Sequence, residues 1–330
     1  MAEVPNTEHH IAVPPRKSAW SAHWILLVLL AILAVFPYIA LQTGNGFYLD
    51  IATRLVILAI AAVSLNLILG FGGLISFGHA AYLGIGAYAV GIPVYYEAYN
   101  GLAHIAIAVG ASALFALVTG AICLRTRGVH FIMITMAFSQ MAFFLFVSME
   151  EFGGDDGLVI ELRSELPGLN MENNLTLYYT AFAVLIAAIF LIHRIVNSRF
   201  GMVLRGSKSN EDRMKAMGYN PYIYRLTAYV ISGAICGLAG ALLGNFTSFI
   251  SPEMMGWTRS GELMFMVILG GVGTTVGPLL GATAFLVLEE FLSRLTIYWH
   301  FPMGVILILT VMFVRGGLAG LLTPGKPDHE

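Results

Sequence analysis

Charged residues are scarce in this chain, and those present lie in short stretches between long uncharged runs. Asp, Glu, Lys and Arg make up 11% of its 330 residues, whereas 58% of the residues are apolar. A soluble domain averages about 25% charged residues, so this composition is typical of a chain that lies largely in lipid. We therefore expect an all-α, polytopic membrane protein, because helices satisfy their own backbone hydrogen bonds inside a bilayer.

The apolar runs have the length of membrane-spanning helices. A helix rises about 1.5 Å per residue, so about 20 residues cross about 30 Å of hydrocarbon. Three runs are short or interrupted by glycine, namely Phe77–Pro93, Leu263–Leu288 and Pro302–Arg315. Ten spans are expected if the run from Leu263 is two helices broken near Gly277-Pro278, and about eight if the broken pieces are re-entrant. The clearest runs are Ala22–Leu41, Ile51–Leu69, His104–Leu124, Val129–Ser148, Leu177–Ile195 and Leu226–Phe249.

Basic residues predict the direction of the chain, because Lys and Arg of short loops stay on the cytoplasmic side. With the N-terminus inside and ten spans, 13 of the 17 basic residues fall in inside segments. The outside loop from Met149 to Leu175 is instead acidic. We therefore expect both termini in the cytoplasm. The basic residues that fall elsewhere are Arg54, Arg163, Arg259 and Arg294.

These features predict one membrane domain between two short tails. We expect a polar cytoplasmic tail over residues 1–21, a transmembrane domain over 22–320 and a cytoplasmic tail over 321–330. The first apolar run is longer than the core of a signal peptide, so we interpret it as a retained anchor. A cytoplasmic loop is expected over 197–225.

Two glycine-rich passages repeat at an offset of about 200 residues. Leu69, Gly70 and Gly73 in the first align with Leu269, Gly270 and Gly273 in the second. Unwound backbone at membrane depth is tolerated where it lines a cavity or is buried in protein, so paired glycine breaks indicate a transport path. Close helix packing, which also favours small residues, is the alternative interpretation.

Helix-start signals accompany both passages. Ser76 is expected to cap a helix that continues through His79, and Thr274 or Thr275 one with Pro278 in its first turn. Such ends offer free N–H groups to a carboxylate, so we expect one or both of them to line the path of an anionic or zwitterionic solute. The candidate path residues, chosen as polar side chains in apolar spans, are Asn66, Ser76, His79, Thr135, Gln140, Thr274 and Thr275.

The sequence shows no enzyme constellation, and we expect no metal, cofactor or nucleic-acid partner. The passage from Gly320 to Lys326 has the spacing of a phosphate-binding loop, but Pro327 follows where that loop needs Ser or Thr. Glu289 and Glu290 lie near the end of an apolar run, with Arg294 at helical spacing to pair with either. We interpret these charges as interfacial rather than as a proton relay.

The expected cytoplasmic loop contains one well-delimited short helix. Ser209 is expected to cap it, Asp212 occupies the capping-box position, Lys215 lies in the last turn and Gly218 supplies a left-handed stop. A capped helix outside the bilayer favours a docking element, and a solvated connector is the alternative.

Several of these segments together resemble the LivM-type permeases, which are membrane subunits of ATP-binding-cassette importers for branched-chain amino acids. The resemblance covers residues 25–320 approximately. It is carried by the passages Ser64–Ala81, Arg127–Phe131, Gly153–Leu158 and Asn210–Gly218. It implies a bacterial inner-membrane subunit that pairs with a second, homologous permease. Two cytoplasmic ATP-binding subunits would drive the pair, and a periplasmic solute-binding protein would supply it.

The resemblance also implies roles for particular residues. The acidic residues Asp155 and Asp156 would dock the binding protein, and the cytoplasmic loop would fit the ATPase. The implied coupling residues are Arg205, Asn210, Glu211, Arg213 and Gly218. The implied function is inward transport of leucine, isoleucine or valine. The Glu-Ala-Ala signature of other importer permeases is not present in this sequence.

Two alternatives remain open. The same machinery could carry urea or short amides. An ion-coupled secondary transporter would need a buried carboxylate in a span, for which only Glu289 or Glu290 is available. An anchor for an electron-transfer enzyme would need facing histidine ligands, and the sequence offers none.

Overall fold

The structure, a computed structural model, describes residues 18–42, 46–167, 170–314 and 316–322. Most of the expected N-terminal tail and of the expected C-terminal tail lies outside the described residues. In chain order the elements are α1 (Ser18–Gln42), α2 (Gly46–Asn66), the π-helix η1 (Leu67–Phe71), α3 (His79–Tyr95), α4 (Gly101–Cys123), α5 (Val129–Val147), the 3-10 helices η2 (Glu150–Phe152) and η3 (Gly154–Asp156), β1 (Leu158–Val159), α6 (Asn174–Val196), α7 (Arg199–Ser209), α8 (Glu211–Ala216), α9 (Pro221–Thr247), β2 (Phe249–Ile250), the 3-10 helix η4 (Pro252–Met255), α10 (Trp257–Gly270), α11 (Gly277–Leu295), α12 (His300–Phe313) and α13 (Gly317–Leu322).

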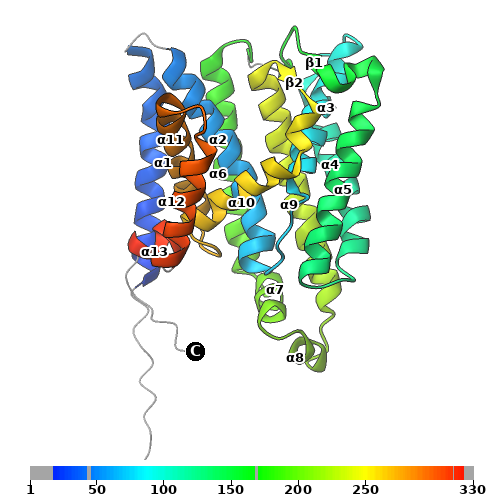
Figure 1. Cartoon of the computed structure of the whole chain (residues 1–330), viewed down its shortest axis with the longest axis vertical. Coiled ribbons are helices and arrows are strands. Elements are labelled where there is room, and N and C mark those ends of the chain that lie inside the picture. The colour runs from blue at the N-terminus through cyan, green and yellow to red at the C-terminus, as the bar shows by residue number, and fades with distance from the viewer. Residues whose placement is uncertain (1–17, 43–45, 168–169, 315, 323–330) are drawn as a thin grey trace, which may run out of the picture.

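The long helices lie side by side along one axis, and α10 crosses between them obliquely (Figure 1). Within the described residues, five helical segments are long and apolar enough to cross a membrane by themselves: Gly46–Phe71, Gly101–Cys123, Val129–Val147, Asn174–Val196 and Pro221–Thr247. Shorter apolar stretches occur at Trp24–Ala40 and His300–Thr310. The fold is therefore all-α and polytopic, as the charge distribution predicts.

Helix α2 with η1 lies at the centre of the bundle. In its most apolar 18-residue window 94% of the residues are buried, compared with 28% in α4 and 22% in α5. Helices α6, α9 and α11 pack around α2, and α3 and α4 pack on α9. The outward faces of α4 and α5 are apolar, which is what a lipid environment requires.

Helices α3 and α9 touch at the level of their backbones. A Cβ atom at Gly86 would lie 1.9 Å from the carbonyl oxygen of Gly237, and one at Gly240 would lie 1.9 Å from that of Leu83. Because apolar side chains gain little by packing together in lipid, membrane helices associate closely through small residues such as these. Substitution by alanine at either glycine would force the two helices apart.

The apolar run that begins at Leu263 is divided between two helices, the first of the two alternatives that the sequence leaves open. Helix α10 ends at Gly270 and α11 begins at Gly277, so the break occupies residues 271–276. The break therefore ends at the Gly277-Pro278 pair that marks it in the sequence. It follows that glycine and proline, rather than charge, interrupt this apolar run.

The two ends of the bundle differ in character (Figure 1). Strands β1 and β2 lie at one end and pair antiparallel, with Leu158 opposite Ile250. Helices α7 and α8 project from the opposite end, where α1 begins and α13 lies. We call these ends the β1–β2 side and the α7–α8 side.

Candidate functional site

The two repeated glycine-rich passages meet in the structure. A Cβ atom at Gly70 would lie 2.5 Å from the backbone nitrogen of Gly273, so the two backbones are in direct contact. Gly70 belongs to the π-helix η1, where α2 loses its regular winding, and Gly273 belongs to the break before α11. π-Helical turns occur frequently at functional sites. The internal repeat therefore marks one junction, built from two helix breaks far apart in sequence.

Asn66 holds this junction together. Its side-chain Nδ2 donates to the carbonyl oxygen of Thr274 at 2.9 Å, and its Oδ1 accepts from the backbone nitrogen of Gly273 at 3.0 Å. The Asn66 side chain is buried, and a buried amide needs such partners to offset its lost hydration. Asn66, an expected path residue, therefore bridges the two breaks.

Thr274 bonds the start of α11, although Val276 rather than a threonine occupies the N-cap position. Its Oγ1 accepts from the backbone nitrogen of Gly277, the first residue of α11, at 2.9 Å. Thr274 rather than Thr275 thus satisfies a free donor at this helix end. Both threonines are partly exposed.

The expected cap at the start of α3 is wrong. The residue at the N-cap position is Gly78, and the Ser76 hydroxyl accepts from the backbone nitrogen of Gly78 itself, at 3.3 Å. Ser76 stands too far before the helix to reach its first turn. Instead the hydroxyl of Ser260, on α10, accepts from the backbone nitrogen of Ala80 at 2.9 Å. A cap supplied from a distant helix leaves no local sequence signal.

The remaining candidate path residues near α3 are His79, Thr135 and Gln140, and they differ in burial and in the residues they contact. His79 is fully buried against the core, with Nε2 3.0 Å from the Ser64 hydroxyl of α2. Thr135 of α5 is also buried, and its Oγ1 accepts from the backbone nitrogen of Phe77 at 3.3 Å. Gln140 lies further along α5 and is partly exposed. The structure thus gathers Ser76, His79 and Thr135 around one helix start, with Gln140 apart.

The loop over 197–225 contains two helices where the sequence predicts one. Helix α7 precedes α8, and Ser209 ends α7 instead of capping α8. The cap of α8 is Asn210, whose Oδ1 accepts from the backbone nitrogen of Arg213 at 2.9 Å. Gly218 has φ of +86°, which confirms the expected left-handed stop. We call α7 and α8 together the α7–α8 module.

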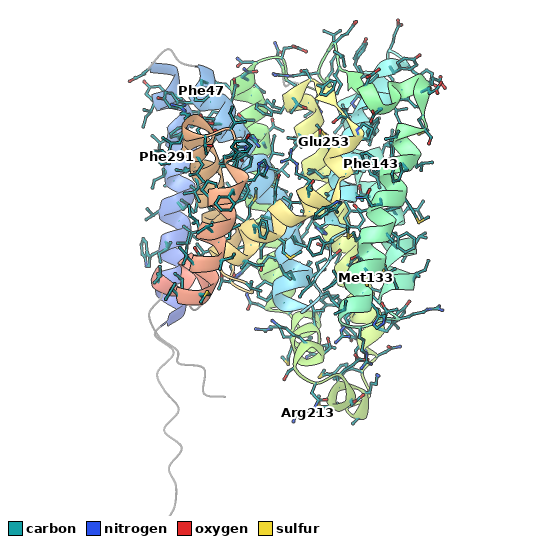
Figure 2. All side chains as sticks on the ribbon, in the orientation of Figure 1. Phe47, Met133, Phe143, Arg213, Glu253 and Phe291 are labelled. Carbon is teal, nitrogen blue, oxygen red and sulfur yellow. The ribbon has the colours of Figure 1, made fainter. Side chains whose placement is uncertain are left out.

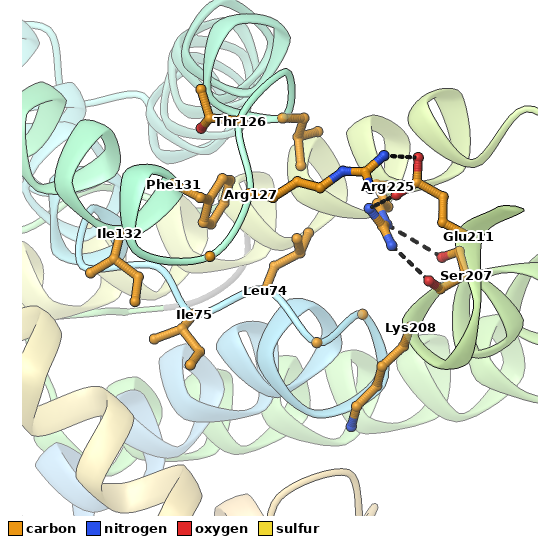
Figure 3. A pocket seen from close by; sticks show the side chains of 14 residues that line it. Leu74, Ile75, Thr126, Arg127, Phe131, Ile132, Ser207, Lys208, Glu211 and Arg225 are labelled. Carbon is orange, nitrogen blue, oxygen red and sulfur yellow. Dashed lines mark hydrogen bonds and ion pairs between the residues drawn. The ribbon is translucent and has the colours of Figure 1, made fainter.

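Glu211 is the electrostatic centre of this module. Its carboxylate pairs with Arg127 at 2.8 Å, Arg225 at 2.9 Å and Lys215 at 2.9 Å. Burial raises the pKa of this carboxyl, but Lys215, Arg225 and Arg127 outweigh burial and hold the pKa of Glu211 below its usual value. Because Arg127 lies in the turn between α4 and α5 and Arg225 on α9, Glu211 ties the module to two parts of the bundle (Figure 3).

The other implied coupling residues differ in exposure. The Arg205 guanidinium donates to the carbonyl oxygen of Val196 at 3.2 Å, which ties α7 to the end of α6. Arg213 is exposed and lies at the far end of the α7–α8 side (Figure 2). Arg205 therefore braces the module, whereas Arg213 is free of the bundle for contact with another molecule.

Lys208 connects the module to the glycine junction. Its Nζ donates to the carbonyl oxygen of Gly70 at 2.9 Å, and a Cβ atom at Gly73 would lie 2.7 Å from its Cγ. The lysine stem therefore lies across the unwound segment after η1. The sequence offers no signal for this contact, because Lys208 is one of several basic residues in a polar loop.

A cavity of about 310 Å³ lies between the module and the bundle (Figure 3). The unwound residues 72–75 form one wall, and the turn between α4 and α5 forms another. Arg127, Lys208, Arg225 and Glu211 all contribute to its lining. The cavity therefore has a basic rim at the point where the module meets the helix break.

Asp155 and Asp156 lie far from these groups, on the β1–β2 side. Both are exposed in η3, between Gly153 with φ of +88° and Gly157 with φ of +81°. Strand β1 follows directly and fixes this loop to β2 at the end of α9. The two carboxylates are thus held at the surface.

Long apolar helices, paired helix breaks and a charged module at one end define a multi-pass membrane transport protein. The chain belongs to the family described as "Branched-chain amino acid transport system / permease component", which matches residues 47–315.

Two proteins of this kind are similar along most of the chain, and a third along less than half of it. The high-affinity branched-chain amino acid transport system permease protein LivM of Salmonella typhimurium is 25% identical over 323 residues, covering 91% of this chain and 75% of that protein. LivM of Escherichia coli K12 is 25% identical, covering 91% and 76%. The probable permease protein LivH of Methanocaldococcus jannaschii is 26% identical over 44% of this chain and 48% of that protein. No solved structure matches the chain.

Proposed function

We propose that this chain is one of two permease subunits of a bacterial ATP-binding-cassette importer that carries leucine, isoleucine or valine inward. It would lie in the inner membrane with both termini and the α7–α8 side in the cytoplasm. Family membership supports this proposal, as does similarity to proteins named LivM and LivH, which suggests a pair of homologous permeases. Two ATP-binding subunits and a periplasmic binding protein would complete the assembly.

The observation that carries the proposal is the bond from Lys208 to Gly70 at 2.9 Å. It links a module outside the bundle to the point where two helices are unwound. A displacement of the module by an ATP-binding subunit would therefore act on a weak point of α2 rather than on a rigid helix. This is the arrangement that a pore driven from outside its own chain requires.

The coupling residues take distinct parts in this proposal. Asn210 and Gly218 fix the two ends of α8, and Arg205 braces α7. Glu211 joins the module to the bundle, and exposed Arg213 is available to the ATP-binding subunit. A displacement of α8 would then reach the bundle through the ion pairs of Glu211 and the hydrogen bond of Lys208 to Gly70.

On the opposite side, Asp155 and Asp156 would receive the binding protein. Exposed carboxylates in a loop held by flanking structure suit electrostatic docking to basic side chains. We assign the path to the junction around Asn66, Thr274 and Thr275 and to the start of α3, with Ser76, His79, Thr135 and Gln140. The N-terminal turns of α3 and α11 would provide backbone polar groups there.

Leucine uptake into proteoliposomes tests the proposal. The chain is reconstituted with and without its proposed partners, first with ATP and then with a proton or sodium gradient. We expect uptake only with all partners and ATP, and competition by isoleucine and valine but not by urea. Accumulation of leucine by the chain alone on an ion gradient would contradict the proposal.

A further inference from the structure

The first turns of α10 carry two charged side chains, Arg259 and Glu262, on a helix that crosses the bundle obliquely (Figure 1). Arg259 and Glu262 form an ion pair, and their side chains keep 31% and 23% of their surface exposed. Glu253, in η4 just before, is also exposed and lies almost level with Phe143 and Phe291 (Figure 2). None of these charges is among the expected path residues.

Two hydrogen bonds fix the depth of this segment. Ser260 accepts from the backbone nitrogen of Ala80, and 15 residues separate Ala80 from the end of α3 at Tyr95, which is about 22 Å of helix. Ser139 donates to the carbonyl oxygen of Met255 at 2.7 Å, well inside α5. Arg259 and Glu262, which flank Ser260, therefore lie within the thickness of about 30 Å that a bilayer core occupies.

Charges at that depth do not face lipid. Ionisable side chains within membrane spans are costly, and almost all of them face protein or a water-filled path. The ion pair is satisfied within its own helix, so a neighbouring subunit need not supply a counter-charge. By contrast, an exposed side chain midway along α4, Leu114, is apolar and 63% exposed.

The segment that leads from the cavity to α3 contacts the helix turn that carries this pair. Ile75 and Ile132 line the end of that cavity opposite Glu211 (Figure 3). Two residues beyond Ile75, the Phe77 ring lies 4.0 Å from where a Cβ atom would stand at Gly261, beside Glu262. Phe77 therefore lies between Ile75 of the cavity lining and the turn of α10 that carries Glu262.

We propose that Arg259 and Glu262 line the translocation path and bind the charged ends of a passing α-amino acid. The guanidinium receives the carboxylate, and the Glu262 carboxylate receives the ammonium group. A zwitterion replaces one ion pair by two, so no net charge enters the site. This inference rests on the proposed function and names the group in the path that recognises its substrate.

An exchange of the two charges distinguishes this role from a structural one. The double variant Arg259→Glu with Glu262→Arg keeps an ion pair at the same helical spacing, and assembly with the partner subunits is checked by co-purification. We expect the assembled variant to take up leucine at least tenfold more slowly. Uptake within twofold of the unmodified importer would overturn the inference, because a structural ion pair tolerates the exchange.

Thiol labelling provides a second measurement that does not depend on activity. Glu262→Cys is placed in the assembled importer and exposed to a cationic, membrane-impermeant methanethiosulfonate. Leu114→Cys serves as the matched control, and the native Cys123 and Cys236 are buried. We expect labelling at 262, slowed at least threefold by leucine, and none at 114. An unreactive residue 262, or labelling that leucine does not slow, would overturn the inference.

The two proposals fail separately. If the unmodified chain with all its partners shows no ATP-driven leucine uptake, the proposed function is wrong. If that uptake is normal while the exchanged variant is also normal, only the assignment of Arg259 and Glu262 is wrong.

Discussion

Asn66 and Thr274, which are 208 residues apart in the chain, are joined by a hydrogen bond of 2.9 Å from the asparagine side chain to the threonine carbonyl. The same amide accepts from the neighbouring Gly273. One side chain of the central helix thus holds the backbone of the break before α11, at the place where the two halves of the repeat meet. Single substitutions at this junction can therefore test how it contributes to the stability and the movement of the protein.

Asn66→Ala is expected to destabilise the protein. The substitution leaves the Gly273 N–H and the Thr274 carbonyl without their side-chain partner, and an unsatisfied buried polar group costs about 1–3 kcal/mol. Thermal unfolding in detergent should show a lower midpoint for this variant. Asn220→Ala, at an exposed asparagine whose side chain caps nothing, is the control. Equal midpoints for the two variants would contradict the bridging role of Asn66.

Lys208→Met is expected to uncouple ATP hydrolysis from transport. Methionine keeps an apolar stem across the unwound segment but cannot donate to Gly70, and hydrogen bonds from charged groups contribute about 1.5–3 kcal/mol. We expect uptake per ATP hydrolysed to fall about tenfold, because 1.4 kcal/mol corresponds to a factor of ten. Both rates are measured in the same proteoliposomes.

Lys208→Arg is the matched control, since its guanidinium retains donors on a long side chain. It should recover most of the coupling that Lys208→Met loses. If the Lys208→Met variant takes up as much leucine per ATP hydrolysed as the unmodified chain, the bond to Gly70 does not couple ATP hydrolysis to transport.

The architecture follows from sequence where one local pattern decides it. Scarce charge and long apolar runs predict an all-α membrane fold, and the glycine and proline near residue 277 mark where the division between α10 and α11 can fall. The bond from the Gly277 nitrogen to Thr274 and the left-handed Gly218 are also local features, since each depends on residues within one turn. These predictions are confirmed by the structure.

Contacts between distant segments escape the same analysis. Ser260 caps α3 from α10, and Lys208 reaches Gly70, but neither residue differs locally from an ordinary serine or lysine. In the sequence, Arg259 is only one of four basic residues that fall outside the expected cytoplasmic segments. The resemblance to a family indicates the class of transporter, whereas tertiary packing determines which polar groups meet.

Gly70→Ala is expected to prevent correct closure of the junction. The added methyl group would lie 2.5 Å from the Gly273 nitrogen, and overpacking of this kind typically costs about 1–3 kcal/mol. Gly110→Ala, in α4 where nothing lies within 4 Å of the added carbon, should be neutral or stabilising. Yields of folded, monodisperse protein after size-exclusion chromatography provide the measurement. Equal yields would show that the two backbones are not held in contact.

Acidification is expected to release the α7–α8 module through Glu211. Because the pKa of Glu211 is lower in the folded protein, its carboxylate stabilises the docked module above the ordinary carboxyl pKa. That stabilisation is lost as the pH falls through the lowered value, when Arg127, Arg225 and Lys215 lose their common acceptor. A spin label at Met217→Cys, which is 56% exposed, reports the mobility of the module.

We expect the label to become more mobile on acidification in the unmodified background and to be mobile already at neutral pH in Glu211→Gln. Asp212→Asn is the control, since the Asp212 side chain is 89% exposed and its nearest cation is 3.8 Å away. The control should keep the acid transition of the unmodified protein. If Glu211→Gln also kept an immobile label at neutral pH and the same transition, the three cations would not depend on Glu211, and the module would be held by Lys208 and by the packing of α7 instead.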